Sequence, residues 1–174
     1  PLFDQLNDDE VFKLIEQRLK SGKDPVYLQE QIRLGMVKVG ILYEKGEYFI
    51  ADLIMAGEIV KNVLKLILAK PENQHHKKLG TILLGTVQGD LHDIGKNIFS
   101  SMIEAEGFEV VDLGIDVPPE EFVTKTKEIH PQIVAMSGVL TLALESMKKT
   151  VATLTAAGLR DHVKILIGGN PVNR

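Results

Sequence analysis

The sequence predicts a small helical bundle followed by an α/β domain that is built on a parallel sheet. Over the first 70 residues, apolar residues recur at the spacing of helices. From residue 80 onward, short β-prone runs alternate with helical stretches, which is typical of parallel strands joined by crossover helices. The 174 residues, 44% of them hydrophobic, suffice for two small cores. We therefore expect a bundle at 1–70, a polar linker at 71–79 and an α/β domain at 80–174.

Three or four short helices are expected in the first domain. Residues 7–10 have the spacing of a capping box, and Ser21-Gly22 ends the apolar stripe that follows. Asp24-Pro25 opens the next helix with an acidic cap and a proline at its first position. Apolar residues return at helical spacing over residues 49–68 and stop before Pro71. Such helices would pack as a bundle.

The second domain is expected to hold four strands and three helices in alternation. The predicted strands are 81–87, 108–112, 132–136 and 163–167, and the predicted helices lie near 94–105, 119–129 and 142–157.

A short polar stretch follows the first predicted strand, where an open α/β sheet binds its ligands. Here Asp90 stands two residues before His92, and a carboxylate so placed can hold one imidazole nitrogen while the other faces a metal or ligand. Asp93 is expected to cap the next helix. Glycines at 85 and 95 would allow close approach of a ligand, although a strand-to-helix turn by itself also accounts for them. Taken alone, the pattern fits a solvated turn histidine equally well.

Two further motifs close the third and fourth predicted strands. Ser137-Gly138-Val139-Leu140-Thr141 ends one, Gly168-Gly169 ends the other, and residues 96–136, a gap of 41, separate Gly95 from Ser137. The set resembles the D-x-H-x-x-G, S-x-L and G-G signature of cobalamin-binding domains. Such domains occur in cobalamin-dependent methionine synthase and in the corrinoid proteins of anaerobic methyltransferase systems. Val139 stands where the signature has leucine.

The resemblance implies a flavodoxin-like, also called Rossmann-like, cobalamin-binding domain. In this fold a fifth strand and a last helix would follow Gly168-Gly169, and we expect this chain to lack them. The resemblance also implies base-off, His-on binding, with His92 as the cobalt ligand. Asp90 would hold the far nitrogen of that ring and meet Ser137, so that the pair tunes the basicity of the histidine. The displaced nucleotide tail would occupy a pocket lined by Gly95, Ser137, Val139 and Gly168-Gly169. The other cofactor-binding candidates are Asp93, Ile94, Leu140, Thr141 and Asn170.

The resemblance extends to the bundle. Methyl-carrying relatives have a helical cap over the upper face of the corrin, and residues 49–59 resemble the segment that covers the cobalt. Phe49, Met55 and Ile59 are therefore cap candidates. The alternative for each is an ordinary place in the core of the bundle.

The resemblance implies a corrinoid methyl carrier that is not an enzyme by itself. It would accept a methyl group from a substrate-specific methyltransferase of the O-demethylase, methylamine or methanol type. A second methyltransferase would pass the group to tetrahydrofolate or a thiol coenzyme, and a reductive activator would restore the corrinoid. The alternatives are a cobalamin-dependent sensor and a phosphorylated receiver-like domain. The latter would use Asp90, Asp112 and Asp116 but leaves the Ser137 and Gly168-Gly169 motifs unexplained.

Composition narrows the other possibilities. The formal net charge is −4 with no concentrated basic segment, which argues against nucleic acid as a partner. The absence of cysteine excludes disulfides, thiolate metal sites and iron–sulfur clusters. No apolar run approaches the roughly 20 residues that span a bilayer, and no signal-peptide pattern is present. We therefore expect a cytoplasmic protein with no membrane partner.

Overall fold

The computed structural model describes residues 8–68 and 78–169 of the chain. It divides into two compact units, Pro1–Lys78 with Ser101–Gly107, and Leu79–Ser100 with Phe108–Arg174. None of the helices in the described ranges is both long and apolar enough to cross a membrane.

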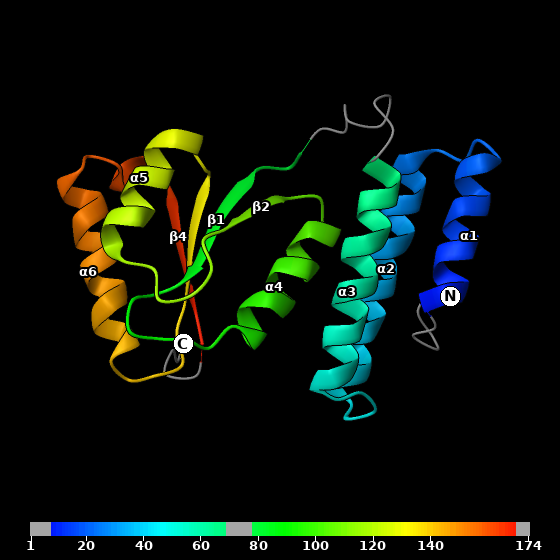
Figure 1. The fold of residues 1–174 in the computed structure, drawn as a ribbon, viewed down its shortest axis with the longest axis horizontal. Coiled ribbons are helices and arrows are strands. Elements are labelled where there is room, and N and C mark those ends of the chain that lie inside the picture. Colours follow the sequence, from blue (N-terminus) through cyan, green and yellow to red (C-terminus); the bar gives the residue numbers. More distant parts are fainter. Residues whose placement is uncertain (1–7, 69–77, 170–174) are drawn as a thin grey trace. The chain divides into compact units, whose positions relative to one another are not determined.

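The described part of the first unit contains three helices, α1 (Asp8–Lys20), α2 (Pro25–Glu44) and α3 (Ile50–Leu68), shown in blue to cyan-green in Figure 1. The Asp24 carboxylate accepts a hydrogen bond from the Val26 N–H at 2.9 Å, so the predicted start of α2 is confirmed. At α3, the Phe49 N–H donates to Asp52 Oδ2 at 2.7 Å. Of the expected three or four helices, three are present within residues 8–68.

Helix α3 packs against both α1 and α2, and these three helices share an apolar core. The buried apolar side chains of this core include Ile15 of α1, Leu28 and Ile32 of α2, and Ile59 and Val63 of α3. The helical spacing read from the sequence therefore identifies the faces that pack together.

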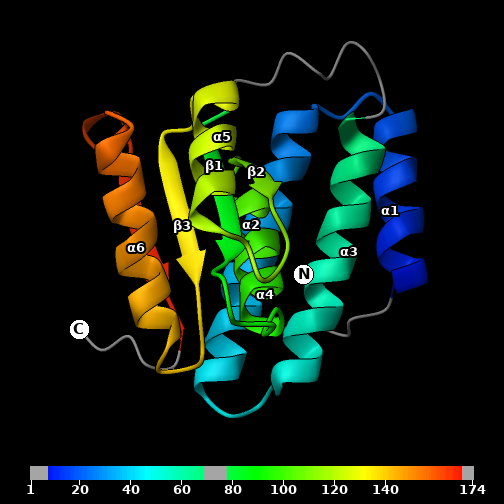
Figure 2. The ribbon, with the colours of Figure 1, turned by 60° about the vertical axis from the view of Figure 1, so that its left-hand side comes forward.

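The second unit contains a parallel sheet of four strands within its described residues, in the order β2-β1-β3-β4. The elements are β1 (Thr81–Thr86), α4 (Ile94–Ala105), β2 (Glu109–Asp112), α5 (Pro119–Ile129), β3 (Ile133–Ser137), α6 (Ala143–Ala156) and β4 (Lys164–Gly168), and the part of α4 from Ser101 onward is counted with the first unit. Figure 2 shows α5 and α6 on one face of this sheet and α4 on the other. Each of these strands and helices begins and ends within one residue of its predicted position.

The strand register gives the two faces of the sheet different partners. Leu83, Val134 and Met136 belong to the core cluster that includes Phe122 of α5 and Met147 of α6. On the opposite face, Leu84, Ala135 and Leu166 lie side by side in register, and Thr86, Ser137 and Gly168 form the next row toward the carboxyl edge. The predicted ligand-binding motifs therefore meet at one edge and on one face of the sheet.

Gly85 faces the other side. A Cβ atom there would lie 3.0 Å from the ring of Phe122 and 3.2 Å from Val117 Cγ2. The expectation that Gly85 admits a ligand is wrong, because its missing side chain makes room for α5 instead.

Candidate functional site

Asp90 anchors the loop that follows β1. Its side chain is fully buried, and its Oδ1 accepts hydrogen bonds from His92 Nδ1 at 2.7 Å and from the His92 N–H at 3.0 Å. Its Oδ2 accepts from the N–H groups of Val139 at 2.6 Å and Leu140 at 2.9 Å, which belong to the loop after β3. One carboxylate thus joins the histidine to a segment about 50 residues away.

These hydrogen bonds fix which nitrogen of the neutral His92 ring carries the proton. Burial raises the pKa of Asp90, but the N–H groups of Leu140, His92 and Val139 and the His92 side chain together hold it well below its usual range. An ionised carboxylate only accepts hydrogen bonds, so His92 carries its proton on Nδ1. In the neutral ring, Nε2 then has the free lone pair, which is the state that binds a metal ion.

The His92 backbone is held as firmly as its ring. Buried Thr86 donates its hydroxyl to the His92 carbonyl oxygen at 2.9 Å. Asp116 accepts from the Gly89 N–H at 2.7 Å and donates its own N–H to the Asp90 carbonyl at 3.1 Å. The His92 side chain is nevertheless 55% exposed, so a rigid loop presents the imidazole to solvent.

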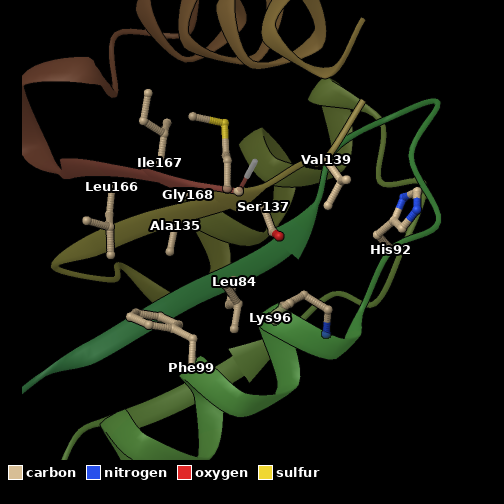
Figure 3. Close-up of a pocket in the computed structure, with 13 residues that line it drawn as sticks. Leu84, His92, Lys96, Phe99, Ala135, Ser137, Val139, Leu166, Ile167 and Gly168 are labelled. Atoms are coloured by element: carbon tan, nitrogen blue, oxygen red, sulfur yellow. The ribbon is translucent and has the colours of Figure 1, made fainter. Parts of the chain in front are cut away.

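A cavity of about 350 Å³ lies beside His92, between α4 and the strands (Figure 3). Its lining residues are Leu84, His92, Gly95, Lys96, Phe99, Ala135, Met136, Ser137, Val139, Leu166, Ile167, Gly168 and Gly169. All five residues predicted to line the pocket are among them: Gly95, Ser137, Val139 and Gly168-Gly169.

The glycines keep this cavity open. A Cβ atom at Gly95 or Gly168 would meet nothing within 4 Å, so a side chain at either position would project into open space. Gly169 has φ +128°, and a Cβ there would lie 1.7 Å from the Gly138 carbonyl oxygen, so only glycine fits. An imidazole held at one ring nitrogen beside a mostly apolar, glycine-walled cavity suits a bulky cofactor that contains a metal ion.

The predicted contact between Asp90 and Ser137 is wrong. Both Asp90 oxygens are occupied by His92, Val139 and Leu140, and in the described residues the Ser137 hydroxyl forms no hydrogen bond with Asp90. Ser137 lines the cavity instead. Backbone amides took its place because the loop after β3 turns its N–H groups toward the buried carboxylate.

The remaining candidates have simpler places. Asp93 precedes α4, and its side chain accepts from the Asn97 amide at 3.2 Å, as its carbonyl does from the Asn97 N–H at 2.8 Å. Ile94 is 54% exposed at the start of α4, and Thr141 is exposed before α6; neither is among the described residues that line the cavity. Asn170 lies outside the described residues.

The three cap candidates differ in exposure. Phe49 is 70% exposed and Met55 45% exposed. Ile59 is 1% exposed, so its assignment to an open cap surface is wrong, and it is a core side chain. Met55 and Ile59 lie one turn apart on α3 and Phe49 precedes that helix, and the resemblance to a cap segment does not say which of them faces the core.

Sequence reasoning missed Lys96, which lines the cavity although its side chain is only 2% exposed. Its Nζ donates to Asp112 Oδ2, and to Asn97 Oδ1 at 2.9 Å. A lysine in the first turn of a helix usually points to solvent, so its position carried no signal. The available hint was Asp112, an acid at the carboxyl end of a strand.

Comparison with known proteins agrees with this site. Residues 80–173 match a family model described as a B12 binding domain, and residues 4–68 match a second model with the same description. The trimethylamine corrinoid protein 1 of Methanosarcina acetivorans is 41% identical over 167 residues, which are 93% of this chain and 76% of that protein.

Two solved structures are also similar. A cobalamin-binding protein from Desulfitobacterium hafniense DCB-2 is 47% identical with a TM-score of 0.82, over 98% of this chain and 82% of that one. A methanol:cobalamin methyltransferase complex from Methanosarcina barkeri contains a chain that is 28% identical with a TM-score of 0.81, over 99% of this chain and 66% of that one.

The fold and the site are those of a B12-binding protein, with a helical unit before a parallel α/β domain. The chain belongs to the corrinoid methyl-carrier proteins of methylamine and methanol methyltransferase systems. Its cofactor is a corrinoid, as the D-x-H-x-x-G pattern predicted.

Proposed function

We propose that the chain binds its corrinoid base-off, with His92 Nε2 as the lower ligand to cobalt and the nucleotide tail in the cavity. The observation that carries the proposal is the Asp90–His92 pair, in which Nδ1 is held at 2.7 Å and Nε2 is left free. The open space at Gly95 and Gly168 supports the placement of the tail. When bound, the corrinoid supplies a cobalt ion that takes up and gives away a methyl group.

The chain's own residues would supply a ligand of constant orientation. Asp90 keeps the proton on Nδ1, and Thr86 holds the backbone of His92, so the imidazole needs no rearrangement to bind a metal. Apolar side chains lie near it in the sequence and on the same edge: Leu91, Ile94 and Leu140 are 66%, 54% and 43% exposed. These side chains would form an apolar surface on which a macrocycle can pack.

The partners follow from what the similar proteins are called. One is named for trimethylamine and another comes from a complex with a methanol:cobalamin methyltransferase. We infer that this chain receives its methyl group from a substrate-specific methyltransferase of the methylamine or methanol type, in preference to the O-demethylase type. A second methyltransferase that uses tetrahydrofolate or a thiol coenzyme would remove it, and a reductive activator would restore the corrinoid.

The helical unit would serve as the cap. Phe49 and Met55 are the exposed apolar side chains that suit the upper face of a corrin, whereas Ile59 is buried. Covering the methyl–cobalt bond would keep solvent from it until a partner docks.

Electron paramagnetic resonance of the Co(II) form, with nitrogen-15 histidine in the full chain, tests the ligand assignment. The label should change the hyperfine splitting in the wild-type protein, and His92→Ala should abolish the label effect. His162→Ala is the matched control, since His162 is exposed in the same unit, precedes the amino end of β4 and is not among the described residues that line the cavity. A splitting that ignores the label would reject His92 as ligand.

A further inference from the structure

We propose that the cavity selects corrinoids by the polarity of the lower base, so that benzimidazole and phenolic bases are accepted and adenine is discriminated against. The inference rests on the proposed function, since it places the base in this cavity. Its evidence is the uneven distribution of polar side chains along the cavity wall.

The sheet contributes two rows of side chains to that wall. Thr86, Ser137 and Gly168 form the outer row at the carboxyl edge, where Ser137 brings a hydroxyl. The inner row, two residues deeper in each strand, is Leu84, Ala135 and Leu166. Every side chain of the inner row is apolar; Leu84 and Ala135 are 3% and 2% exposed, and Leu166, on the edge strand, is 43% exposed.

Helix α4 continues the same gradient. Gly95 and Lys96 stand in its first turn, and Phe99, one turn deeper, adds an aromatic ring near Leu84 and Leu166 in Figure 3. The Lys96 ammonium is already held by Asp112 and Asn97. Among the described lining residues, the side chains of the inner row and of Phe99 therefore offer no hydrogen-bond donor or acceptor.

The candidate bases differ in what they carry into such a space. A benzimidazole presents C–H and methyl groups on its six-membered ring, and a cresol presents a methyl group. The six-membered ring of adenine carries an amino group and two ring nitrogens. Buried without partners these would lose their hydrogen bonds to water, which costs free energy that an apolar base does not lose.

Equilibrium dialysis of the full chain against three corrinoids, with dimethylbenzimidazole, p-cresol or adenine as the base, measures this selection. Adenine is the weaker cobalt ligand and is released more readily, so without selection its corrinoid would bind at least as tightly as the benzimidazole form. We expect at least a tenfold weaker Kd for the adenine form, which is about 1.4 kcal/mol. The cresol form should bind no more weakly than the benzimidazole form.

Substitutions at two neighbouring residues test whether the inner row causes the weaker binding of the adenine form. Leu166→Gln places an amide on the inner row and should reduce the adenine deficit to about a third of its wild-type value or less. Ile167→Gln is the matched control: Ile167 is also 43% exposed and is also among the lining residues, but its side chain points to the opposite side of the strand from Leu166 in Figure 3, so an amide there does not enter the inner row. Ala135→Ser offers a second inner-row variant should Leu166→Gln melt at a much lower temperature than the wild type.

The outcomes separate the two proposals. Equal Kd values for the adenine and benzimidazole forms, or a deficit that neither inner-row variant reduces, would overturn the selection and leave His92 ligation intact. A corrinoid without any nucleotide tail that binds as tightly as the benzimidazole form would overturn the placement of the tail itself. We expect weaker binding of the adenine form that only the inner-row variants relieve, and this result supports both the selection and the placement of the tail.

Discussion

Lys96 and Asp112 form an ion pair between the first turn of α4 and the carboxyl end of β2. The lysine side chain is 2% exposed, whereas the aspartate is 35% exposed and also accepts the Gly114 N–H at 2.9 Å. The buried ammonium of Lys96 therefore depends on Asp112 for its charge compensation, whereas water can partly solvate the Asp112 carboxylate. The pair also closes one wall of the cavity, because Lys96 lines it.

We expect Asp112→Asn to destabilise the fold more than Lys96→Met. Losing the carboxylate leaves a buried ammonium without its counter-ion, which should cost about 2–3 kcal/mol. Losing the ammonium leaves a half-exposed carboxylate that water can solvate, at about 1 kcal/mol or less. Urea unfolding followed by circular dichroism measures both, and the reverse order would contradict this account of the pair.

Asp90→Asn should lower the free energy of unfolding by about 1–3 kcal/mol at neutral pH, because an amide cannot accept all four of the hydrogen bonds that this carboxylate receives. The pKa of Asp90 is lowered in the folded state, so its contribution is present above the unfolded value of about 3.9 and is lost as the pH falls below it. The difference between wild type and variant should thus shrink below about pH 4.

Asp93→Asn, three residues further along at an exposed position, is the control for that experiment and should give a small difference at every pH. A wild-type advantage over Asp90→Asn that stays constant down to about pH 2 would show that the carboxylate charge does not stabilise the loop.

Ser137→Ala should leave the His92 ring unchanged, since the hydroxyl is not a partner of Asp90. Nitrogen-15 chemical shifts of the imidazole in the corrinoid-free protein report which ring nitrogen carries the proton. We expect wild type and Ser137→Ala to share the Nδ1–H form and Asp90→Asn to lose it. A shifted tautomer in Ser137→Ala would reinstate the serine as part of the relay.

Gly168→Val should weaken corrinoid binding, whereas Gly138→Ala should lower the stability of the fold. A side chain at Gly168 enters open space, so the fold should tolerate it within about 1 kcal/mol while corrinoid binding weakens at least tenfold. At Gly138 a Cβ would lie 2.5 Å from Ala143 Cβ, and overpacking should cost about 1–3 kcal/mol of stability. Thermal melting and equilibrium dialysis with cobalamin distinguish the two effects.

The sequence was sufficient for the elements and for most of the cavity. Buried strands such as Thr81–Thr86 are short apolar runs between polar turns, and parallel strands bring the motifs at their carboxyl ends together. Val139 lines the cavity as its motif position predicted, although it departs from the usual leucine.

Contacts that depend on loop conformation could not be read the same way. The amides of Val139 and Leu140 donate to Asp90 because of the conformation of the loop after β3. The residue types do not predict this, since every residue except proline has a backbone N–H. The burial of Lys96 could not be predicted because a charged side chain is buried only when a partner of opposite charge lies beside it, and here that partner is Asp112. Ile59 was misassigned because the resemblance to a cap segment does not say which side chains of that helix point into the core of the bundle.

Asp90 accepts from two amides that follow it by 49 and 50 residues. Such a contact can close only after β3 has joined β1, and distant contacts of this kind form late because the intervening chain must first be ordered. A partly synthesised chain that ends before residue 139 therefore lacks the brace that aims His92. The orientation of the imidazole is therefore fixed only once most of the α/β domain has folded, so a nascent chain does not yet present this ring in its final position.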